Sequence, residues 1–334
     1  MSIALLRNSI AQIGDSNRSD VLLTVMILQV VEPFSPISQA GGWMTHVDGA
    51  AKIFQHEGPR PLKSEYDTAL FNHARQYSII GGILRRKPVL FSQPQWLAIS
   101  GSAPAANLVN RLIDIGSLVP GLLNETDEAR RHDSPEQIFY GLLRKLDLLY
   151  EEIVTWIEDF SSSMEHEIST TIDIKEMHAY NEIMEGDTTF LPVFRFASFR
   201  TAWRLILGWT FHYHILNAIL DILTTRGDIV YYRKAPELEL ELLRVVTNIC
   251  MTFPQLFAKD FGVISRAAIM LPLRFSTRFY RSRGQFMELN WCNKIAKEVF
   301  SRHEGLNHVY NPEWMDGLQV HSSIEAPYPK SVPE

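Results

Sequence analysis

Apolar side chains recur along this chain with the spacing of helices. The clearest stripe is Ile138, Leu142, Leu146, Leu149 and Ile153, whose members lie three or four positions apart, as on one face of an α-helix. We find no convincing run of period-two alternation, which would indicate a strand. The pattern therefore predicts the all-α fold class, as a single large helical body of about ten helices.

Short polar and glycine-containing motifs mark individual helices. Ser64-x-x-Asp67 resembles a capping box, and it predicts a helix over Glu65–Arg85 that closes before Pro88. Gly81-Gly82 lies inside this helix and indicates close packing against another element rather than a phosphate-binding loop.

Prolines predict further boundaries. Ser134 and Pro135 offer an N-cap and a first helical residue, so a helix is expected to start there. Pro120 predicts a break in the preceding helix, because proline lacks the N–H that continues a helical ladder. Pro236 likewise predicts the start of a later helix.

One segment, Phe196–Thr225, is long, aromatic and largely uncharged, so we expect it to form a buried central helix. Trp203 and Leu207 fall on one side of that helix, and Trp209 and Tyr213 on another. If the body encloses a ligand cavity, this helix should line it, because ligand pockets are mostly apolar with few polar groups. The candidate pocket residues are Trp209, His214 and Asn217. The alternative is a solid core around the same helix.

Composition limits the function. The chain has 334 residues, 46% hydrophobic and 21% charged, as expected of a globular protein with a sizeable core. Its formal net charge of −6 suits DNA coating poorly, because such surfaces neutralise phosphates with cations. Two cysteines, Cys250 and Cys292, are too few for a six-cysteine zinc cluster, and no metal site is predicted. The longest uncharged central run, Leu205–Leu220, is too short to span a membrane.

Two pairs of side chains could carry metal chemistry. Glu182 and Glu185 lie three positions apart and would share a helix face, where carboxylates can hold Mg²⁺ against a substrate diphosphate. The alternative is a solvated helix end. His212 and His214 are two positions apart, which points helical side chains in opposed directions and argues against a metal pair. No cofactor is expected, apart from Mg²⁺ if the glutamates act in catalysis.

Two groups of cations also invite interpretation. Arg274 and Arg278 are one turn apart and would share a helix face, which could meet an anionic ligand or surface acids. The run Arg85-Arg86-Lys87 could act as a weak nuclear-import patch. The alternative is that its cations stabilise a helix C-terminus through the helix dipole.

Short motifs follow one another in a fixed order along most of the chain. They are Trp43-x-x-His46-x-x-Gly49-Ala50-x-x-Ile53 with Glu57-Gly58-Pro59, Arg75, Arg86-Lys87-Pro88, Pro94-x-Trp96, Leu118-x-Pro120-x-Leu122-Leu123, Leu271-Pro272-Leu273-Arg274 and Trp291-Cys292. In this order they resemble the regulatory (middle homology) domain of fungal Zn₂Cys₆ zinc-cluster transcription factors, although Glu57 replaces that family's usual arginine. The resemblance implies a helical regulatory domain over residues 1–310, and the prolines from Pro312 onward predict a partly frayed tail over residues 311–334.

The resemblance also implies a function. It indicates a nuclear regulatory or interaction protein, without catalytic residues, that modulates transcription in secondary metabolism. It would act through a small hydrophobic ligand, or through another transcription factor or co-regulator as partner. The family's six-cysteine DNA-binding module is absent and the domain's first helices are not matched, so we expect no direct DNA binding.

The first motif has a plain physical interpretation. Trp43, His46, Gly49, Ala50 and Ile53 lie on one face of a helix. Gly49 and Ala50 are small enough to let another helix approach closely. We therefore predict that the motif determines packing rather than catalysis.

The alternative function is a cytoplasmic enzyme of specialised metabolism, such as a Mg²⁺-dependent terpene cyclase. Aromatic side chains of the central helix would suit its site, since aromatic faces stabilise cations. The D-D-x-x-D motif of standard all-α cyclases is absent. The catalytic site would therefore have to be formed by Glu182, Glu185 and Arg274.

Overall fold

The computed structural model describes residues 18–32, 42–101, 108–132, 134–172, 180, 184, 186–226, 229–257 and 262–301, so the tail predicted over residues 311–334 lies outside the described residues. Within the described part, the chain forms ten α-helices, which confirms the all-α fold class. They are α2 (Arg18–Val31), α3 (Gly42–Glu57), α4 (Glu65–Arg85), α5 (Pro94–Gly101), α6 (Leu108–Arg131), α7 (Glu136–Ser163), α9 (Phe199–Arg226), α10 (Ile229–Leu256), α11 (Gly262–Ser282) and α12 (Phe286–Ser301). The other elements are the 3₁₀ helices η2 (Leu90–Ser92) and η3 (Glu165–Glu167) and the strands β1 (Ile168–Thr171) and β2 (Val193–Phe196).

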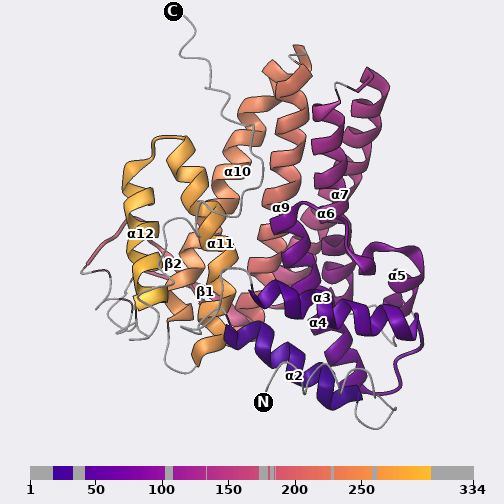
Figure 1. Cartoon of the computed structure of the whole chain (residues 1–334). Coiled ribbons are helices and arrows are strands. Elements are labelled where there is room, and N and C mark those ends of the chain that lie inside the picture. Colours follow the sequence, from indigo (N-terminus) through magenta and orange to yellow (C-terminus); the bar gives the residue numbers. More distant parts are fainter. Residues whose placement is uncertain are drawn as a thin grey trace, which may run out of the picture.

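Helix α9 is the centre of the body. It packs against α6, α7, α10 and α11, and the long helices α6, α7, α9 and α10 run alongside one another in Figure 1. Helices α11 and α12 pack together on the opposite side of the picture from α5. Helices α2, α3 and α4 pack on one another, and α4 connects this layer to the long helices through α6.

Local signals correctly located the start of α4. The Ser64 side chain accepts a hydrogen bond from the Asp67 N–H at 3.0 Å, as an N-cap residue does. The helix ends at Arg85, and Arg86 follows with a left-handed φ of 50°. The Lys87 N–H then donates to the Gly82 carbonyl, which closes the helix in the manner of a Schellman motif.

Two of the boundaries predicted from prolines are wrong. Pro120 lies inside α6 and Pro236 lies inside α10, so neither helix breaks or begins there. The start predicted at Ser134 and Pro135 is confirmed, since α7 begins at Glu136, although its N-cap is Pro135 and makes no side-chain capping bond. An internal proline costs about 3 kcal/mol in an isolated helix. Burial of the apolar faces of these long helices offsets that cost.

Gly82 explains how α6 accommodates its proline. A Cβ atom at Gly82 would lie 3.0 Å from the Pro120 ring and 2.5 Å from Val89, both too close. The glycine therefore makes room for the ring, and the predicted close-packing role of the Gly81-Gly82 pair is confirmed at Gly82. Gly49 is different, because a Cβ there would meet nothing within 4 Å. The prediction that another helix approaches closely at Gly49 is therefore wrong. Helix α3 instead buries Trp43, Val47 and Ala50.

A small antiparallel sheet was missed by the sequence pattern. Strands β1 and β2 pair with Ile168 opposite Phe196, and each has four residues. Such short strands carry too few positions to show alternation. Gln255 of α10 supports the sheet by exchanging hydrogen bonds with the main chain of Phe196. This support depends on a contact between distant segments, which a local pattern does not reveal.

The apolar stripe of α7 is largely as predicted. Leu142, Leu146, Leu149 and Ile153 are buried, but Phe139 takes the first buried position because Ile138 is 50% exposed. Among the helices that the structure describes, none combines the length and apolar character required to cross a membrane.

Candidate functional site

Five helices meet around a cavity of about 300 Å³. Its walls come from α2, α3, α4, α9 and α11, so it lies between the N-terminal helices and the large core. The lining residues are Gln29, Val30, Trp43, His73, Gln76, Tyr77, Ile80, Leu84, Phe199, Trp203, Leu207, Thr210, Ala267, Ala268, Met270, Leu271, Pro272 and Arg274. This volume lies at the lower end of the range of small-molecule pockets.

Aromatic pairs form two of the walls. On α4 the rings of His73 and Tyr77 stack with their centroids 4.6 Å apart. On α9 the rings of Phe199 and Trp203 stack at 6.4 Å with an interplanar angle of 11°. Both pairs are separated by one helical turn, so their rings lie above one another on one helix face. The cavity is therefore bordered by broad, rigid apolar surfaces.

Polar side chains around the cavity tie its walls together. The Trp203 indole N–H donates to Gln76 Oε1 at 3.2 Å, which links α9 to α4. Gln29 Nε2 donates to the His46 carbonyl at 3.2 Å, which links α2 to α3. His46 Nε2 also lies 2.6 Å from Glu32. These bonds hold the helices that surround the cavity in a fixed relation.

The charge in the lining is positive. Arg274 is 4% exposed, and no aspartate or glutamate is among the described lining residues. Burial lowers the pKa of His73 to about 4, so its imidazole is neutral at pH 7. Burial raises the pKa of Tyr77 to about 12, so its hydroxyl keeps its proton. The lining thus carries one full charge, that of Arg274.

The three residues predicted to form a pocket do not line this cavity. Trp209 lies against Phe194 at 5.5 Å between ring centroids. His214 meets the ring of Phe275 edge-on, and burial lowers its pKa to about 3. Asn217 Nδ2 donates to the Tyr213 carbonyl of its own helix.

Helix α9 instead faces the cavity with residues of its first half. The contributing residues are Phe199, Trp203, Leu207 and Thr210. Trp209 belongs to the large core, and His214 and Asn217 lie further along the helix. Both sides are apolar, and an all-round apolar helix gives no sign of which side adjoins empty space.

The cations of α11 separate into different environments. Arg274 is buried at the cavity, whereas Arg278, one turn later, is exposed. The two arginines therefore differ in exposure, although residues one turn apart share a helix face. Arg283 pairs with Glu239 and lies over the Phe279 ring at 3.9 Å, so it serves the surface of the fold. Only Arg274 of these three cations borders the cavity.

The metal-binding candidates gain no support from the described part of the chain. Glu182 and Glu185 lie outside the described residues. Among the described residues, no group of three histidine, cysteine, aspartate or glutamate side chains could hold a metal ion. His212 Nε2 lies 3.2 Å from Glu241, which also accepts the Tyr150 hydroxyl at 2.8 Å. His212 thus belongs to a polar contact between helices.

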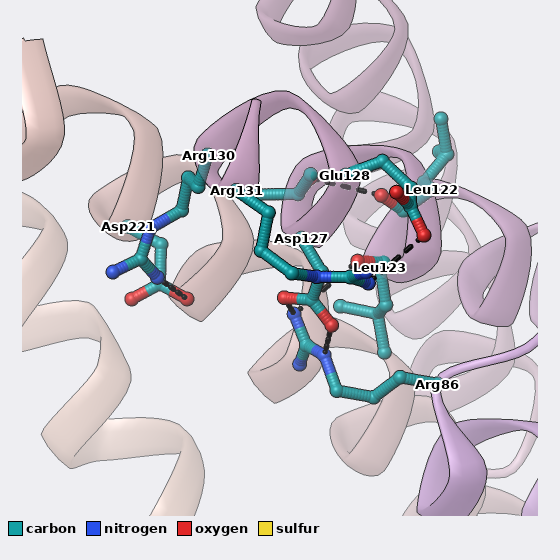
Figure 2. A network of polar contacts seen from close by, with 9 residues as sticks. Arg86, Leu122, Leu123, Asp127, Glu128, Arg130, Arg131 and Asp221 are labelled. Carbon is teal, nitrogen blue, oxygen red and sulfur yellow. Dashed lines mark hydrogen bonds and ion pairs between the residues drawn. The ribbon is translucent and has the colours of Figure 1, made fainter. Parts of the chain in front are cut away.

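The basic run at the end of α4 is engaged within the fold. Arg85 Nη1 donates to both carboxylate oxygens of Asp48, at 2.9 and 2.8 Å. Figure 2 shows Arg86 reaching Asp127 of α6, to which its Nη2 donates at 2.7 Å. The same Nη2 lies 3.3 Å from the Leu123 carbonyl. Arg85 and Arg86 therefore join α4 to α3 and α6, consistent with a structural helix end.

Several cavity residues belong to the sequence motifs that carry the family resemblance, but these motifs did not predict a common site. Trp43 opens the first motif, while Leu271, Pro272 and Arg274 belong to a motif more than two hundred positions later. The motifs themselves were visible in the sequence, but only the fold shows that they meet at one cavity. His73, Gln76 and Tyr77 were missed because nothing local distinguishes them from other residues of an amphipathic helix.

Comparison of the chain with known protein families, with curated proteins and with solved structures found no match in any of the three. The cavity therefore has to be interpreted from its own geometry.

Proposed function

We propose that this protein is a transcription-factor-like regulatory protein that senses a small, largely apolar molecule in the cavity between α2, α3, α4, α9 and α11. The observation that carries the proposal is the position of the motif residues. Trp43 and the Leu271-Pro272-Leu273-Arg274 motif, which carry the resemblance to a regulatory domain, both contribute to the cavity lining. The proposal thus joins a resemblance in sequence to one location in the fold.

The chemistry of the lining favours binding over turnover. Acid–base catalysis needs a group poised to exchange a proton, usually oriented by a second polar group. His73 is neutral, and no carboxylate stands beside it among the described lining residues. Cysteine and serine nucleophiles are likewise missing from that set. A ligand bound there would be held rather than transformed.

The architecture offers a route from ligand to surface. Residues of α2 and α11 line the cavity, and these helices are joined to the rest through different neighbours. A ligand that contacts several helices stabilises the arrangement in which they converge, by an amount set by its concentration relative to its dissociation constant. We propose that this stabilised arrangement binds another transcription factor or a co-regulator in the nucleus.

DNA reading would belong to that partner. The sequence has two cysteines, and both are buried and free. We expect the isolated protein to give no footprint on duplex DNA at physiological salt. A specific footprint without an added partner would contradict this part of the proposal.

A cavity-filling variant tests the proposed function. Leu207 lines the cavity, so Leu207→Trp should fill part of it, while Leu118→Trp is a matched change at a residue of α6 that is 36% exposed. A panel of apolar compounds should contain members that raise the melting temperature of the wild type and of Leu118→Trp but not of Leu207→Trp. If no compound does so, or if Leu207→Trp responds equally, the cavity is not a ligand site.

A further inference from the structure

We propose that the cavity selects an aromatic carboxylic acid of about two rings, with the carboxylate bound by Arg274 and the rings against Trp203 and Leu207. This inference rests on the proposed function, because it names the chemical class of ligand for the same cavity. It depends on the volume of the cavity, the kinds of surface that border it and the sign of its charge.

The volume sets the size of the ligand. A cavity of about 150 Å³ in a protein core accepts one benzene ring. The present cavity is about 300 Å³, twice that volume. A ligand with two fused rings and one small polar substituent fits this space.

The walls favour flat rings. Trp43, Tyr77 and Trp203 present aromatic side chains from three different helices, and Leu207 and Ile80 add aliphatic surface. Aromatic groups gain energy beyond burial of area when they stack in an offset manner or meet edge to face. The Trp203 ring is held by its stack on Phe199 and by its hydrogen bond to Gln76. A flat ligand therefore meets a wall that is already ordered.

Gln76, Tyr77 and Arg274 each bring a hydrogen-bond donor to the cavity, while Gln29, whose Nε2 donates to the His46 carbonyl, leaves its Oε1 as an acceptor. Gln76 uses Oε1 to accept from the Trp203 indole, so the group it has left for a ligand is its N–H₂. The Tyr77 hydroxyl keeps its proton at neutral pH, because burial raises its pKa to about 12. Arg274 adds a guanidinium, whose five N–H donors can engage a ligand beside its contacts within the protein. A carboxylate, which only accepts hydrogen bonds, matches such donors.

The charge of the cavity lining also favours an anionic ligand. Arg274 is the charged group among the described lining residues, although the chain as a whole has a net charge of −6. At a buried site the attraction between opposite charges is screened less than at the surface. A cationic ligand would meet the buried Arg274 guanidinium, and the described lining residues include no carboxylate that would attract it, so the cavity should reject it. A neutral amide of the same shape should bind less tightly than the acid.

Three probes of equal shape test the ligand class on the wild-type protein. They are 2-naphthoate, its neutral amide 2-naphthamide and the cation 2-naphthylmethylammonium, each titrated calorimetrically at pH 7.5. We expect 2-naphthoate to bind about tenfold or more tightly than the amide, as a charge-assisted hydrogen bond predicts. We expect the cation not to bind. Equal or tighter binding of the amide overturns the inference.

A matched pair of variants locates the selectivity. Arg274→Gln should remove the preference for 2-naphthoate over 2-naphthamide, and Arg278→Gln, the same change at the exposed arginine on α11, should retain it. Retained selectivity in a folded Arg274→Gln protein overturns the assigned role of Arg274. If that variant does not fold, the wild-type series still decides the ligand class.

The outcomes separate this inference from the proposed function. If the amide binds as well as the acid and Leu207→Trp abolishes both, the cavity is a ligand site but not one for acids. If none of the three probes binds, the two-ring inference is wrong, while the compound panel decides the proposed function independently.

Discussion

Two sides of helix α9 differ although both are apolar. On one side Leu205 is 1% exposed and Trp209 is 6% exposed, and both belong to the large core. On the other side Trp203 and Leu207 border a cavity of about 300 Å³. The comparison teaches that apolar character decides which residues leave water, but not whether the space they face is filled.

Complementary shapes fill the solid side. Gly208 of α9 lies against the Trp156 ring, since a Cβ at that glycine would approach Trp156 Cζ3 to 2.6 Å. Gly116 of α6 is covered in the same way by the ring of Phe211. Large rings over glycines bring helices close and leave little space. At the cavity, Ala267 and Ala268 of α11 are small, and space is left where five helices meet.

The largest expected effect comes from truncating a leucine on each side. Leu205 is 1% exposed in the large core and Leu207 is 4% exposed at the cavity. We expect Leu205→Ala to cost about 4 kcal/mol of unfolding free energy and Leu207→Ala about 2 kcal/mol, because fewer packed neighbours are lost beside an existing cavity. Urea unfolding with unchanged slopes measures both values. Equal costs would mean that the two sides are packed alike.

The next effect comes from adding one methyl group to the solid side. Gly208→Ala should cost roughly 1–3 kcal/mol through overpacking. The Trp156 ring cannot easily yield, because it stacks on Phe160 at 4.9 Å and its N–H donates to the Leu108 carbonyl. Thermal unfolding of the variant measures the loss.

Gly49→Ala is the matched control for that change. A Cβ at Gly49 meets nothing within 4 Å, and alanine favours the helical state. We expect this variant to be stabilised by about 0.5–1 kcal/mol. Equal destabilisation at Gly208 and Gly49 would contradict the close contact between α9 and Trp156.

Acid should weaken the fold through two buried histidines, one at the cavity and one beside Phe275. The pKa of His73 at the cavity is lowered to about 4, and that of His214 beside Phe275 to about 3, against an ordinary value of 6.5. The unfolded chain therefore binds protons first, so stability present above pH 6.5 is lost as the pH falls toward 4. Each histidine should contribute up to about 1 kcal/mol per pH unit.

The variants His73→Gln and His214→Gln check that expectation. Each should flatten the dependence of unfolding free energy on pH between pH 6.5 and 5, a range in which most carboxylates stay ionised. For His214, burial is the main cause and the cations Arg86 and Arg278 add to it. An unchanged slope in either variant would show that the corresponding imidazole gains its proton without unfolding.

Local chemistry made part of this fold predictable. The Ser64 cap and the largely uncharged segment of α9 gave helix positions within a few residues. The internal Pro120 did not, because its tolerance depends on Gly82 of another helix. The same limit applies to the cavity. Its location depends on how five helices meet, whereas the periodicity of α9 records only that both sides are apolar.

For the site residues too, sequence spacing predicted some features, while others depend on packing. Arg274 was a candidate because arginine on a helix can bind an anion, and its burial at the cavity comes from the packing of α11. Spacing placed Arg278 on the same face, but it did not reveal that Arg278 is exposed while Arg274 is buried. A separation of four positions turns a helix by about 40° beyond a full turn, enough to carry a side chain from a buried edge into solvent. Mg²⁺ binding by Glu182 and Glu185 stays a prediction.

The smallest effect is spectroscopic and separates two tryptophans of α9. Trp203 borders the cavity, and Trp209 packs against Phe194 on the other side. Decahydronaphthalene-2-carboxylate, a saturated two-ring acid, should bind more weakly than a flat aromatic acid, but it does not absorb in the tryptophan band, so its binding at high concentration can be followed by tryptophan fluorescence. We expect the fluorescence change to persist in Trp209→Phe and to shrink in Trp203→Phe. The latter variant also loses the hydrogen bond to Gln76, which should cost about 1 kcal/mol of stability. A signal lost in Trp209→Phe and kept in Trp203→Phe would assign the ligand to the solid side of α9.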